Sequence, residues 1–493
     1  MAADRLDTQV IVVGAGPVGL MLAGELRLGG LDVVVLEKRH VHTDESRAST
    51  LHARTMEILD SRGLLTHFGT PPNETRGHFG GIPLDLTLPS PFPGQWKVPQ
   101  TKTEAVLEEW ALSLGADIRC GHELRALTQA GPGEGQYVQA EAAGREGVLH
   151  VRGQFLVACD GEDSTVRCLM GAEFPGHDAR RELLRADVEG ITVPDRRFNR
   201  LPQGLAIAAR RNDGVTRVMV HEFGSTAQPR AEEAQFEEIA TIWKRVTGED
   251  ISGGKPLWVN SFGDANRQLV SYRHGRILFA GDAAHRQMPI GGQALNLGLQ
   301  DAFNLGWKLA ATVTGRAGDD LLDTYHQERH AVGRRVLANI EAQARLLLGG
   351  AEVEPVRTVL TELIAHTPVR EHLAGMISGL DIRYDADPGD HPLLGARLPH
   401  TVLLSGEGNL TTAQLLHPGR GVLMDLSGGA GAPLSPYSDW ADRVSLLAAL
   451  PQAGSSLDGT DGVLLRPDGH VAWAGSGTDG LRQALERWFG PPR

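Results

Sequence analysis

The chain has 493 residues, of which 41% are hydrophobic and 22% are charged, and its formal net charge is -13. This composition is ordinary for a globular protein, and the acidic balance argues against a nucleic-acid partner, since phosphate binding needs clustered Lys and Arg. The length predicts roughly two to four domains with a core large enough to enclose a deep pocket. Three cysteines, none of them in a CxxC pair, exclude a disulfide framework and a zinc ribbon.

The apolar segment at residues 9–28 is interrupted by four glycines and carries Glu25, which is not the pattern of a signal peptide. No other stretch supplies the ~20 uninterrupted apolar residues of a membrane span. We therefore expect a soluble, cytoplasmic protein without a membrane partner. The 19 histidines show no ligand spacing such as HExxH, and neither a GxSxG elbow nor a P-loop is present, so no metal site is expected.

A strand–helix–strand pattern opens the chain. Residues 10–13 form a short β-branched apolar run, which is typical of a buried parallel strand. Residues 20–28 have helical character, and residues 31–36 form a second buried strand that Glu37 closes. The segment is therefore a βαβ unit of about 30 residues with an acidic residue at the end of its second strand.

The turn between the first strand and the helix carries GAGPVG, a GxGxxG motif. Gly14 is expected to make the tight turn, Gly16 to let the backbone approach a pyrophosphate, and Gly19 to let helix and strand pack closely. The helix N-terminus offers free N–H groups to phosphates, and Glu37 is placed to accept hydrogen bonds from a ribose. The motif alone does not separate NAD from FAD. The expected nucleotide contacts are Gly14, Gly16, Pro17, Gly19, Glu37 and Lys38.

The rest of the chain alternates between strand-rich and helical stretches. Residues 175–275 are expected to form a substrate-side sheet with one helix near residues 232–247. The other predicted strands and loops are 72–100, 121–157 (a small meander), 154–159, 276–280, 421–426, 463–466 and 470–474, and the other predicted helices are 103–114, 293–314, 323–348 and 481–489.

Three further segments complete a four-part signature. Residues 160–167 (DGEDSTVR), 276–285 (RILFAGDAAH) and 289–296 (PIGGQALN) resemble the DG motif, the GD motif and the flavin-facing loop of the class A flavoprotein aromatic hydroxylases, the phenol hydroxylase and para-hydroxybenzoate hydroxylase type. Segments 77–81 (GHFGG) and 391–395 (HPLLG) make the chain most similar to the angucycline-type aromatic polyketide oxygenases.

The resemblance implies an α/β fold in which a Rossmann-like FAD-binding domain carries an inserted β-sheet substrate domain and is followed by a thioredoxin-like C-terminal domain. We place the FAD-binding domain in residues 1–175, with a substrate-side segment at about 72–100, and in residues 276–390. The substrate domain would be residues 176–275 and the thioredoxin-like domain residues 391–493. Because that last domain contains no cysteine, we expect it to serve packing or homodimer contacts rather than redox chemistry.

The same resemblance assigns roles around the flavin. Asp282 would bind the ribityl chain or the pyrophosphate of FAD, and Arg47 and Gln100 would contact the flavin. Asp160 would lie between the FAD site and the approach of NAD(P)H. The remaining expected flavin contacts are Gly281, Pro289, Gly291, Gly292, Ala294, Leu295 and Asn296.

Two positions depart from the family pattern. Ala294 stands where the family usually has glycine, and its methyl group is expected to alter flavin mobility or oxygen access. The acids Glu162 and Asp163 are unusual in the DG motif. They either weaken the binding of an anionic nicotinamide cofactor or simply face water.

The implied activity is an FAD- and NAD(P)H-dependent monooxygenase that hydroxylates an angucycline-type aromatic polyketide in antibiotic biosynthesis. NADPH or NADH would reduce FAD, O₂ would add at flavin C4a, and the hydroperoxide would transfer its distal oxygen to an electron-rich ring carbon. The alternatives are Baeyer–Villiger oxygen insertion, an antibiotic-inactivating hydroxylation and a non-oxygenating flavoprotein. The sequence does not separate them.

No single group stands out as the base that would deprotonate a phenolic substrate. The candidates are His285, Arg217 and His221, each of which has an ordinary structural alternative. Candidate pocket walls, any of which could equally belong to the core, are Phe79, Phe92, Trp96, Phe223 and Met288.

Overall fold

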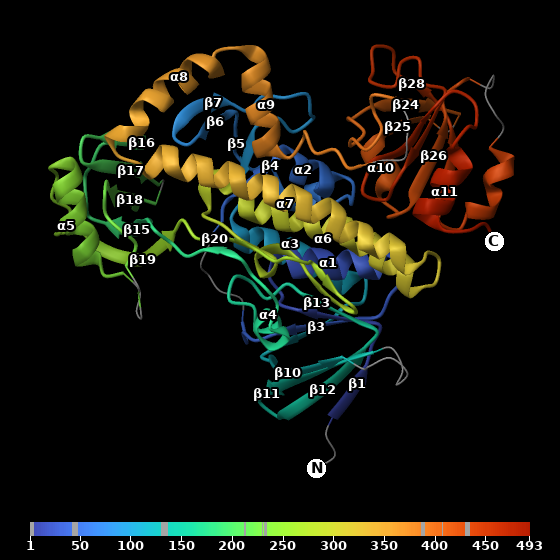
Figure 1. Cartoon of the computed structure of the whole chain (residues 1–493), viewed down its shortest axis with the longest axis horizontal. Coiled ribbons are helices and arrows are strands. Elements are labelled where there is room, and N and C mark those ends of the chain that lie inside the picture. Colours follow the sequence, from blue (N-terminus) through green and yellow to red (C-terminus); the bar gives the residue numbers. More distant parts are fainter. Residues whose placement is uncertain are drawn as a thin grey trace.

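The computed structural model describes residues 4–41, 48–129, 137–211, 213–228, 230, 234–385, 390–406, 408–428 and 434–493. Figure 1 shows a central helical and sheet region with a strand-rich unit on one side and the C-terminal unit on the other. Within the described part of the chain, no helix is long and apolar enough to cross a membrane.

A six-stranded sheet, in the order β21-β22-β13-β2-β3-β9, forms the centre of the molecule. Its strands are parallel except for β21. Every residue of β2 and β13 is buried, which accounts for their uninterrupted apolar sequences. The strand bounds are β2 (Val10–Val13), β3 (Val33–Glu37), β9 (Asp117–Cys120), β13 (Phe155–Ala158), β21 (Arg273–His274) and β22 (Ile277–Phe279).

Helices cover one face of this sheet, and a second sheet shares its hydrophobic core on the other side (Figure 1). α1 (Pro17–Leu28) packs against both α3 (Gln100–Ser113) and α6 (Gln293–Val313), and α6 packs against the long α7 (Asp319–Leu348). α1 starts earlier than the sequence pattern predicts because Pro17 fits the first turn of a helix. The second sheet, in the order β1-β12-β11-β10, comprises β1 (Asp4–Asp7), β12 (Gly147–Gly153), β11 (Val138–Gly144) and β10 (Glu123–Gln129).

A five-stranded antiparallel sheet, here called the substrate sheet after the role that the sequence predicts for it, forms the strand-rich unit at the left of Figure 1. α5 (Phe236–Thr247) packs on one face of it and α7 lies against the other. Successive side chains of a strand point to opposite faces of the sheet, so Leu184 packs with α5 and Leu183 packs with α7. Its order is β16 (Arg196–Leu201), β17 (Gly204–Arg210), β18 (Thr216–Glu222), β15 (Glu182–Glu189) and β19 (Lys255–Gly263).

Shorter elements join these units. A three-stranded sheet of β14 (Gly176–His177), β20 (Asn266–Gln268) and β23 (His285–Arg286) links the substrate sheet to the central one. The others are β4 (Thr50–His52), β5 (Asn73–Glu74), β8 (Gln95–Lys97), the hairpin β6 (Arg76–Phe79) and β7 (Ile82–Asp85), α2 (Ala53–Asp60), α4 (Thr165–Met170), α8 (Glu354–Ile364) and α9 (Thr367–Ser378).

The C-terminal unit has the predicted thioredoxin-like arrangement. A four-stranded sheet in the order β27-β26-β29-β30 has one parallel and two antiparallel pairings, and α11 packs against it. Its elements are β24 (Val402–Ser405), β25 (Gly408–Thr411), α10 (Thr412–Leu416), β26 (Gly421–Asp425), β27 (Val444–Ala448), β28 (Leu450–Pro451), β29 (Gly462–Leu465), β30 (Val471–Gly475) and α11 (Leu481–Phe489).

Buried charges join this unit to the central helices. Arg466 contacts Glu328 of α7 at 2.6 Å and also pairs with Asp468, while Lys308 of α6 contacts Glu328 at 2.7 Å. All four side chains are almost fully buried, and the pairing compensates the cost of removing them from water.

The sheets and helices described above confirm the predicted α/β architecture. The predicted segment limits at residues 175, 275 and 390 stay proposals.

Candidate active site

The turn before α1 has the backbone that its three glycines predict. Gly14 has φ +102°, and a Cβ there would lie 2.4 Å from the carbonyl oxygen of Cys159. A Cβ at Gly19 would lie 2.0 Å from the carbonyl oxygen of Gly14. A Cβ at Gly16 would meet no protein atom within 4 Å. Gly14 and Gly19 are therefore required by the turn itself, whereas Gly16 faces open space at the helix N-terminus.

Glu37 is fixed beside that open space. Its Oε2 accepts a hydrogen bond from the N–H of Ala15 at 2.8 Å, and its Oε1 accepts one from the N–H of Arg39 at 2.8 Å. Lys38 is exposed and does not line the pocket. We call this pocket the nucleotide cradle; it is lined by Ala15, Gly16, Glu37, Arg39, Val41, Glu104 and Cys120.

Four lining residues outside the GxGxxG motif were not predicted from the sequence: Arg39, Val41, Glu104 and Cys120. Arg39 lies only two residues past Glu37, so proximity in sequence was an available signal. Glu104 of α3 and Cys120 of β9 reach the cradle through the packing of distant segments, and no local pattern marks them.

The DG and GD motifs meet on the far side of the turn. The guanidinium of Arg167 donates to the carbonyl of Ala283 at 3.1 Å and ties the two motifs together. Asp160 accepts a hydrogen bond from the N–H of Val166 at 3.1 Å, and burial raises the pKa of its carboxyl group. Asp282 stays accessible although burial raises the pKa of its carboxyl group too, so its side chain lies in a concave space. The cofactor roles expected of Asp160 and Asp282 stay predictions.

Behind the GD motif lies a fully buried ion-pair network. Asp301 accepts hydrogen bonds from Arg329 at 2.7 Å and from the N–H of Gly281 at 3.1 Å, and it contacts the imidazole of His285 at 2.7 Å. Although burial opposes it, the charge of Arg329 holds the pKa of Asp301 below its ordinary value. Arg329 also donates to Tyr384 at 3.0 Å. The network fixes the GD motif to α6 and α7.

The flavin-facing loop is a tight left-handed turn at the start of α6. Gly291 has φ +65° and Gly292 has φ +70°, a conformation that favours glycine. Asn296 donates to the carbonyls of Gly292 at 2.7 Å and Thr50 at 3.0 Å. No acidic residue occupies the first turn of α6, so no side chain of this turn neutralises the positive end of the helix dipole. Pro289 is exposed, and Ala294 and Leu295 are partly exposed.

His52, which the sequence analysis did not single out, holds this loop. Its Nε2 donates to the carbonyl of Gly291 at 2.7 Å, and its backbone N–H donates to Asn296 at 2.8 Å. The side chain is buried, and burial lowers the pKa of His52 to about 4. Burial likewise lowers the pKa of His78 to about 4 and that of His470 to about 3.

These histidines predict loss of stability in mild acid. Between about pH 6.5 and pH 4 the unfolded chain binds protons at His52, His78 and His470 that the folded chain does not, so the free energy of unfolding falls as the pH falls. Each proton contributes a slope of about 1.4 kcal/mol per pH unit. Urea unfolding at pH 7, 6 and 5 measures this slope. His52→Gln should make it shallower, and substitution of the exposed His366 by Gln should not.

The three candidate bases all have structural partners. His285 is fully buried against Asp301, and the guanidinium of Arg217 forms an ion pair with Asp187 at 2.7 Å. His221 contacts the carbonyls of Glu182 at 2.8 Å and of Leu348 at 3.1 Å. These contacts favour positioning roles for His285 and His221, and a catalytic role for any of the three stays a prediction.

The predicted pocket walls fall into different clusters. Met288 and Phe223 lie in the apolar layer between the substrate sheet and α7, together with Ile290 of the flavin-facing loop. Phe79 packs under α9, and Phe92 contacts Trp96 edge-to-face with ring centroids 6.3 Å apart. Gln100 accepts a hydrogen bond from the N–H of Ala48 at 3.2 Å. Arg47 lies outside the described residues.

The described residues contain no group of three or more His, Cys, Asp or Glu side chains that could hold a metal ion. The cradle, the accessible Asp282 and the partly exposed N-terminus of α6 instead fit an elongated anionic nucleotide.

Comparison with known proteins agrees with this geometry. The family model described as "FAD binding domain" matches residues 7–340, and the one described as "Aromatic-ring hydroxylase, C-terminal" matches residues 391–492. The chain belongs to the flavin-dependent aromatic-ring hydroxylases. Its C-terminal unit is therefore the C-terminal domain of that family, and its cradle belongs to an FAD-binding domain.

Several known proteins are similar to this chain over nearly its whole length. A 12-dehydrotetracycline 5-monooxygenase/anhydrotetracycline 6-monooxygenase from Streptomyces rimosus is 40% identical, with 98% of this chain and 99% of that protein covered. A dialkyldecalin synthase from Streptomyces rugosporus is 40% identical, with 99% and 100% covered. The crystal structure of CabE, an aromatic hydroxylase from angucycline biosynthesis, has 49% sequence identity and a TM-score of 0.93 and covers 99% of this chain and 100% of that one.

Proposed function

We propose that this hydroxylase uses FAD and NAD(P)H to transfer one atom of O₂ to a ring carbon of an angucycline-type aromatic polyketide. The observation that supports this most is the 49% identity to an angucycline hydroxylase over 99% of the chain. That likeness covers the nucleotide cradle and the substrate sheet alike. The reaction needs both, because one would hold the cofactor and the other would hold the ring that is oxidised.

The cofactor, when bound and reduced, supplies the electrons that activate dioxygen. The chain would hold its adenosine and pyrophosphate end with Gly16 and Glu37 and its ribityl region with Asp282. The loop of Gly291 and Gly292 would lie against the ring, since neither residue carries a side chain to block it. The N-terminus of α6 would stabilise negative charge on the reduced ring. His52 would keep this loop in register.

The substrate face would combine an apolar wall with charged side chains, which include Arg185 and Arg217. Met288, Ile290 and Phe223 form a water-excluding wall between the substrate sheet and α7. On the same face of the sheet, Arg217 is held by Asp187, whose pKa is lowered by this partner although burial opposes the shift. A guanidinium does not deprotonate at neutral pH, so Arg217 would stabilise a phenolate by its charge and would not act as a base.

Isotope labelling tests the proposal. The purified holoenzyme is incubated with NADPH, an angucyclinone and ¹⁸O₂, and the product is analysed by mass spectrometry and NMR. The proposal predicts one labelled oxygen on an aromatic carbon with the ring skeleton intact. A labelled oxygen inserted between two carbons would instead identify Baeyer–Villiger chemistry. An antibiotic-inactivating enzyme would give a labelled hydroxyl on a finished antibiotic and none on the angucyclinone.

A second candidate follows from the 40% identity to a dialkyldecalin synthase. A chain of that kind would bind FAD and convert a polyketide without consuming oxygen. It would give an unlabelled product of unchanged mass in the same experiment, and it would do so without NADPH.

A further inference from the structure

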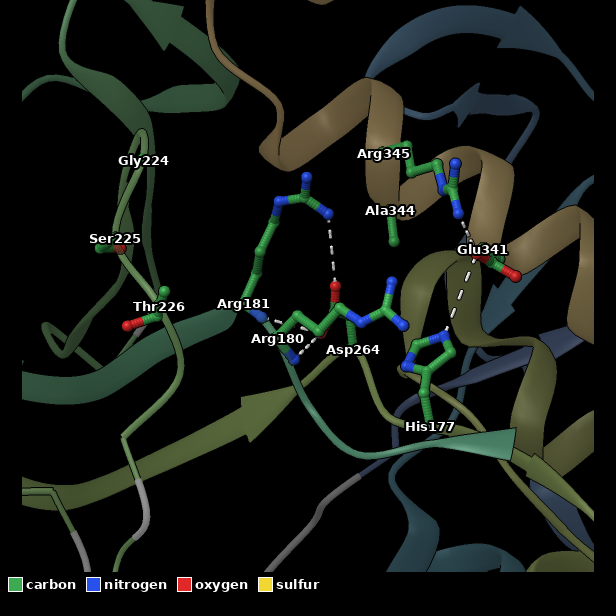
Figure 2. A pocket seen from close by; sticks show the side chains of 10 residues that line it. All are labelled: His177, Arg180, Arg181, Gly224, Ser225, Thr226, Asp264, Glu341, Ala344 and Arg345. Carbon is green, nitrogen blue, oxygen red and sulfur yellow. Dashed lines mark hydrogen bonds and ion pairs between the residues drawn. The ribbon is translucent and has the colours of Figure 1, made fainter. Parts of the chain in front are cut away.

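A pocket of about 400 Å³ opens to solvent between the substrate sheet and α7, outside the nucleotide cradle. Figure 2 shows its walls. The segment that leads from β14 into β15 forms one wall, the turn after β18 forms a second, and the last turns of α7 form the third. Two consecutive arginines, Arg180 and Arg181, lie on the first wall.

A single carboxylate fixes these arginines. Asp264 is buried, and its Oδ1 accepts hydrogen bonds from the backbone N–H groups of Arg180 at 2.6 Å and Arg181 at 2.8 Å. Its Oδ2 lies 3.6 Å from the guanidinium of Arg181. The backbone that carries both side chains is therefore held in place, and the charge of Asp264 is matched by Arg181.

The pocket keeps one positive charge in excess. Its other carboxylate, Glu341, pairs with Arg345 of the same helix at 2.5 Å and lies 4.0 Å from the imidazole of His177. Among the described residues, no carboxylate lies within ion-pair distance of the Arg180 guanidinium. The side chain of Arg180 is exposed at the pocket, so it is available to an anionic ligand.

The pocket lies close to the segment that leads into the flavin-facing loop. β14, on the pocket wall, is two strands from β23 in the linking sheet, a distance of about 10 Å at the usual strand spacing, and β23 ends two residues before that loop. Ala344 lines the pocket and also packs in the apolar layer that contains Ile290 of that loop. A dinucleotide held here by its phosphates would therefore be near the flavin.

The DG motif offers less to such a ligand. Its nearby cation, Arg286, is paired with Glu162 at 3.2 Å and lies 4.0 Å from Asp163. Glu162 is therefore engaged by an arginine. The local charge is one unit negative, since the motif and Arg286 together hold three carboxylates (Asp160, Glu162 and Asp163) and two guanidinium groups (Arg167 and Arg286). A phosphate group would meet a net negative charge there and a net positive charge in the Arg180 pocket.

We propose that the pocket of Arg180 and Arg181 binds the phosphate groups of the nicotinamide dinucleotide that reduces the flavin. This inference rests on the proposed function, because it presupposes NAD(P)H as the reductant. It assigns the binding of a mobile reductant to a site built by the substrate sheet and α7, with no second Rossmann unit.

Equilibrium binding tests the assignment without turnover. Isothermal titration of the FAD-loaded enzyme with NADP⁺ and with NAD⁺ gives both dissociation constants for the wild type and for Arg180→Gln. Loss of one charge-assisted hydrogen bond should raise the NADP⁺ dissociation constant about tenfold. Arg180→Lys keeps the charge and should stay within about threefold. Lys255→Gln is the matched control, since it removes one exposed charge from the opposite end of β19.

The two titrants identify which phosphate is bound. A loss confined to NADP⁺ assigns the pocket to the 2′-phosphate, and an equal loss for both titrants assigns it to the pyrophosphate. Wild-type affinity in Arg180→Gln, with the wild-type enzyme binding NADP⁺ normally, would overturn the assignment while leaving the proposed function in place. Failure of the wild-type enzyme to bind either titrant or to be reduced by NADPH or NADH would overturn the proposed function itself.

Discussion

A Gly16→Ala variant is expected to fold like the wild type and to lose about 10- to 100-fold in affinity for FAD. Its backbone at φ −76° and ψ 179° suits any residue, and a Cβ there meets no protein atom within 4 Å. The added methyl group would occupy only the space in which a pyrophosphate must approach the helix N-terminus. Titration of the apoprotein with FAD, followed by flavin fluorescence, measures the affinity, and urea unfolding of the apoprotein measures the stability.

Two matched substitutions sharpen this test. Gly19→Ala places a Cβ 2.0 Å from the carbonyl of Gly14, so it should reduce both stability and FAD affinity. Gly253→Ala adds the same methyl group at another exposed glycine with open space around it and should change neither. Retention of wild-type FAD affinity by Gly16→Ala would mean that the cofactor does not lie against this turn.

An Asp301→Asn variant is expected to lose about 3–5 kcal/mol of unfolding free energy. The substitution keeps the shape of the side chain but leaves the guanidinium of Arg329 buried without its counter-charge. It also weakens the contact with His285, so the GD motif loses its attachment to α6 and α7. Urea unfolding of the apoprotein at pH 7 measures the loss.

The same measurement on two further variants separates charge burial from general damage. Asp323→Asn breaks the surface ion pair between Asp323 of α7 and Arg273 of β21 and should cost no more than about 1 kcal/mol. Adding Arg329→Met to Asp301→Asn removes the uncompensated charge and should restore part of the lost stability. Equal, small losses for Asp301→Asn and Asp323→Asn would contradict the account of this network.

The sequence predicted those parts of the site that lie within one local segment. The GxGxxG turn, Glu37 and the loop at Gly291 are each encoded by a few adjacent residues whose backbone requirements are visible in the sequence. His52 could not be found in this way, because its partner Gly291 is far away in the chain and one histidine carries no local pattern. The Arg180 pocket is likewise formed by four segments that are far apart in the chain.

The sequence also did not predict which charged side chains are buried. Glu, Lys and Arg usually lie on the protein surface, so the sequence does not mark Glu328, Lys308 and Arg466 as buried. Only the packing of the C-terminal domain on α6 and α7 buries them together. For apolar residues, the sequence could not separate those that line a pocket from those that belong to the core. Phe79 and Met288 are indistinguishable as pocket candidates in the sequence, yet the first packs under α9 and the second beside the flavin-facing loop.

The most direct test of the central claim is to measure oxygen and NADPH consumption by the FAD-loaded enzyme with and without an angucyclinone. We expect the enzyme alone to consume both slowly. We expect strong stimulation by the polyketide, with one NADPH used for each product molecule that gains an oxygen atom. A flavin-loaded enzyme that converts the polyketide, or leaves it untouched, without any substrate-stimulated use of oxygen would contradict the claim.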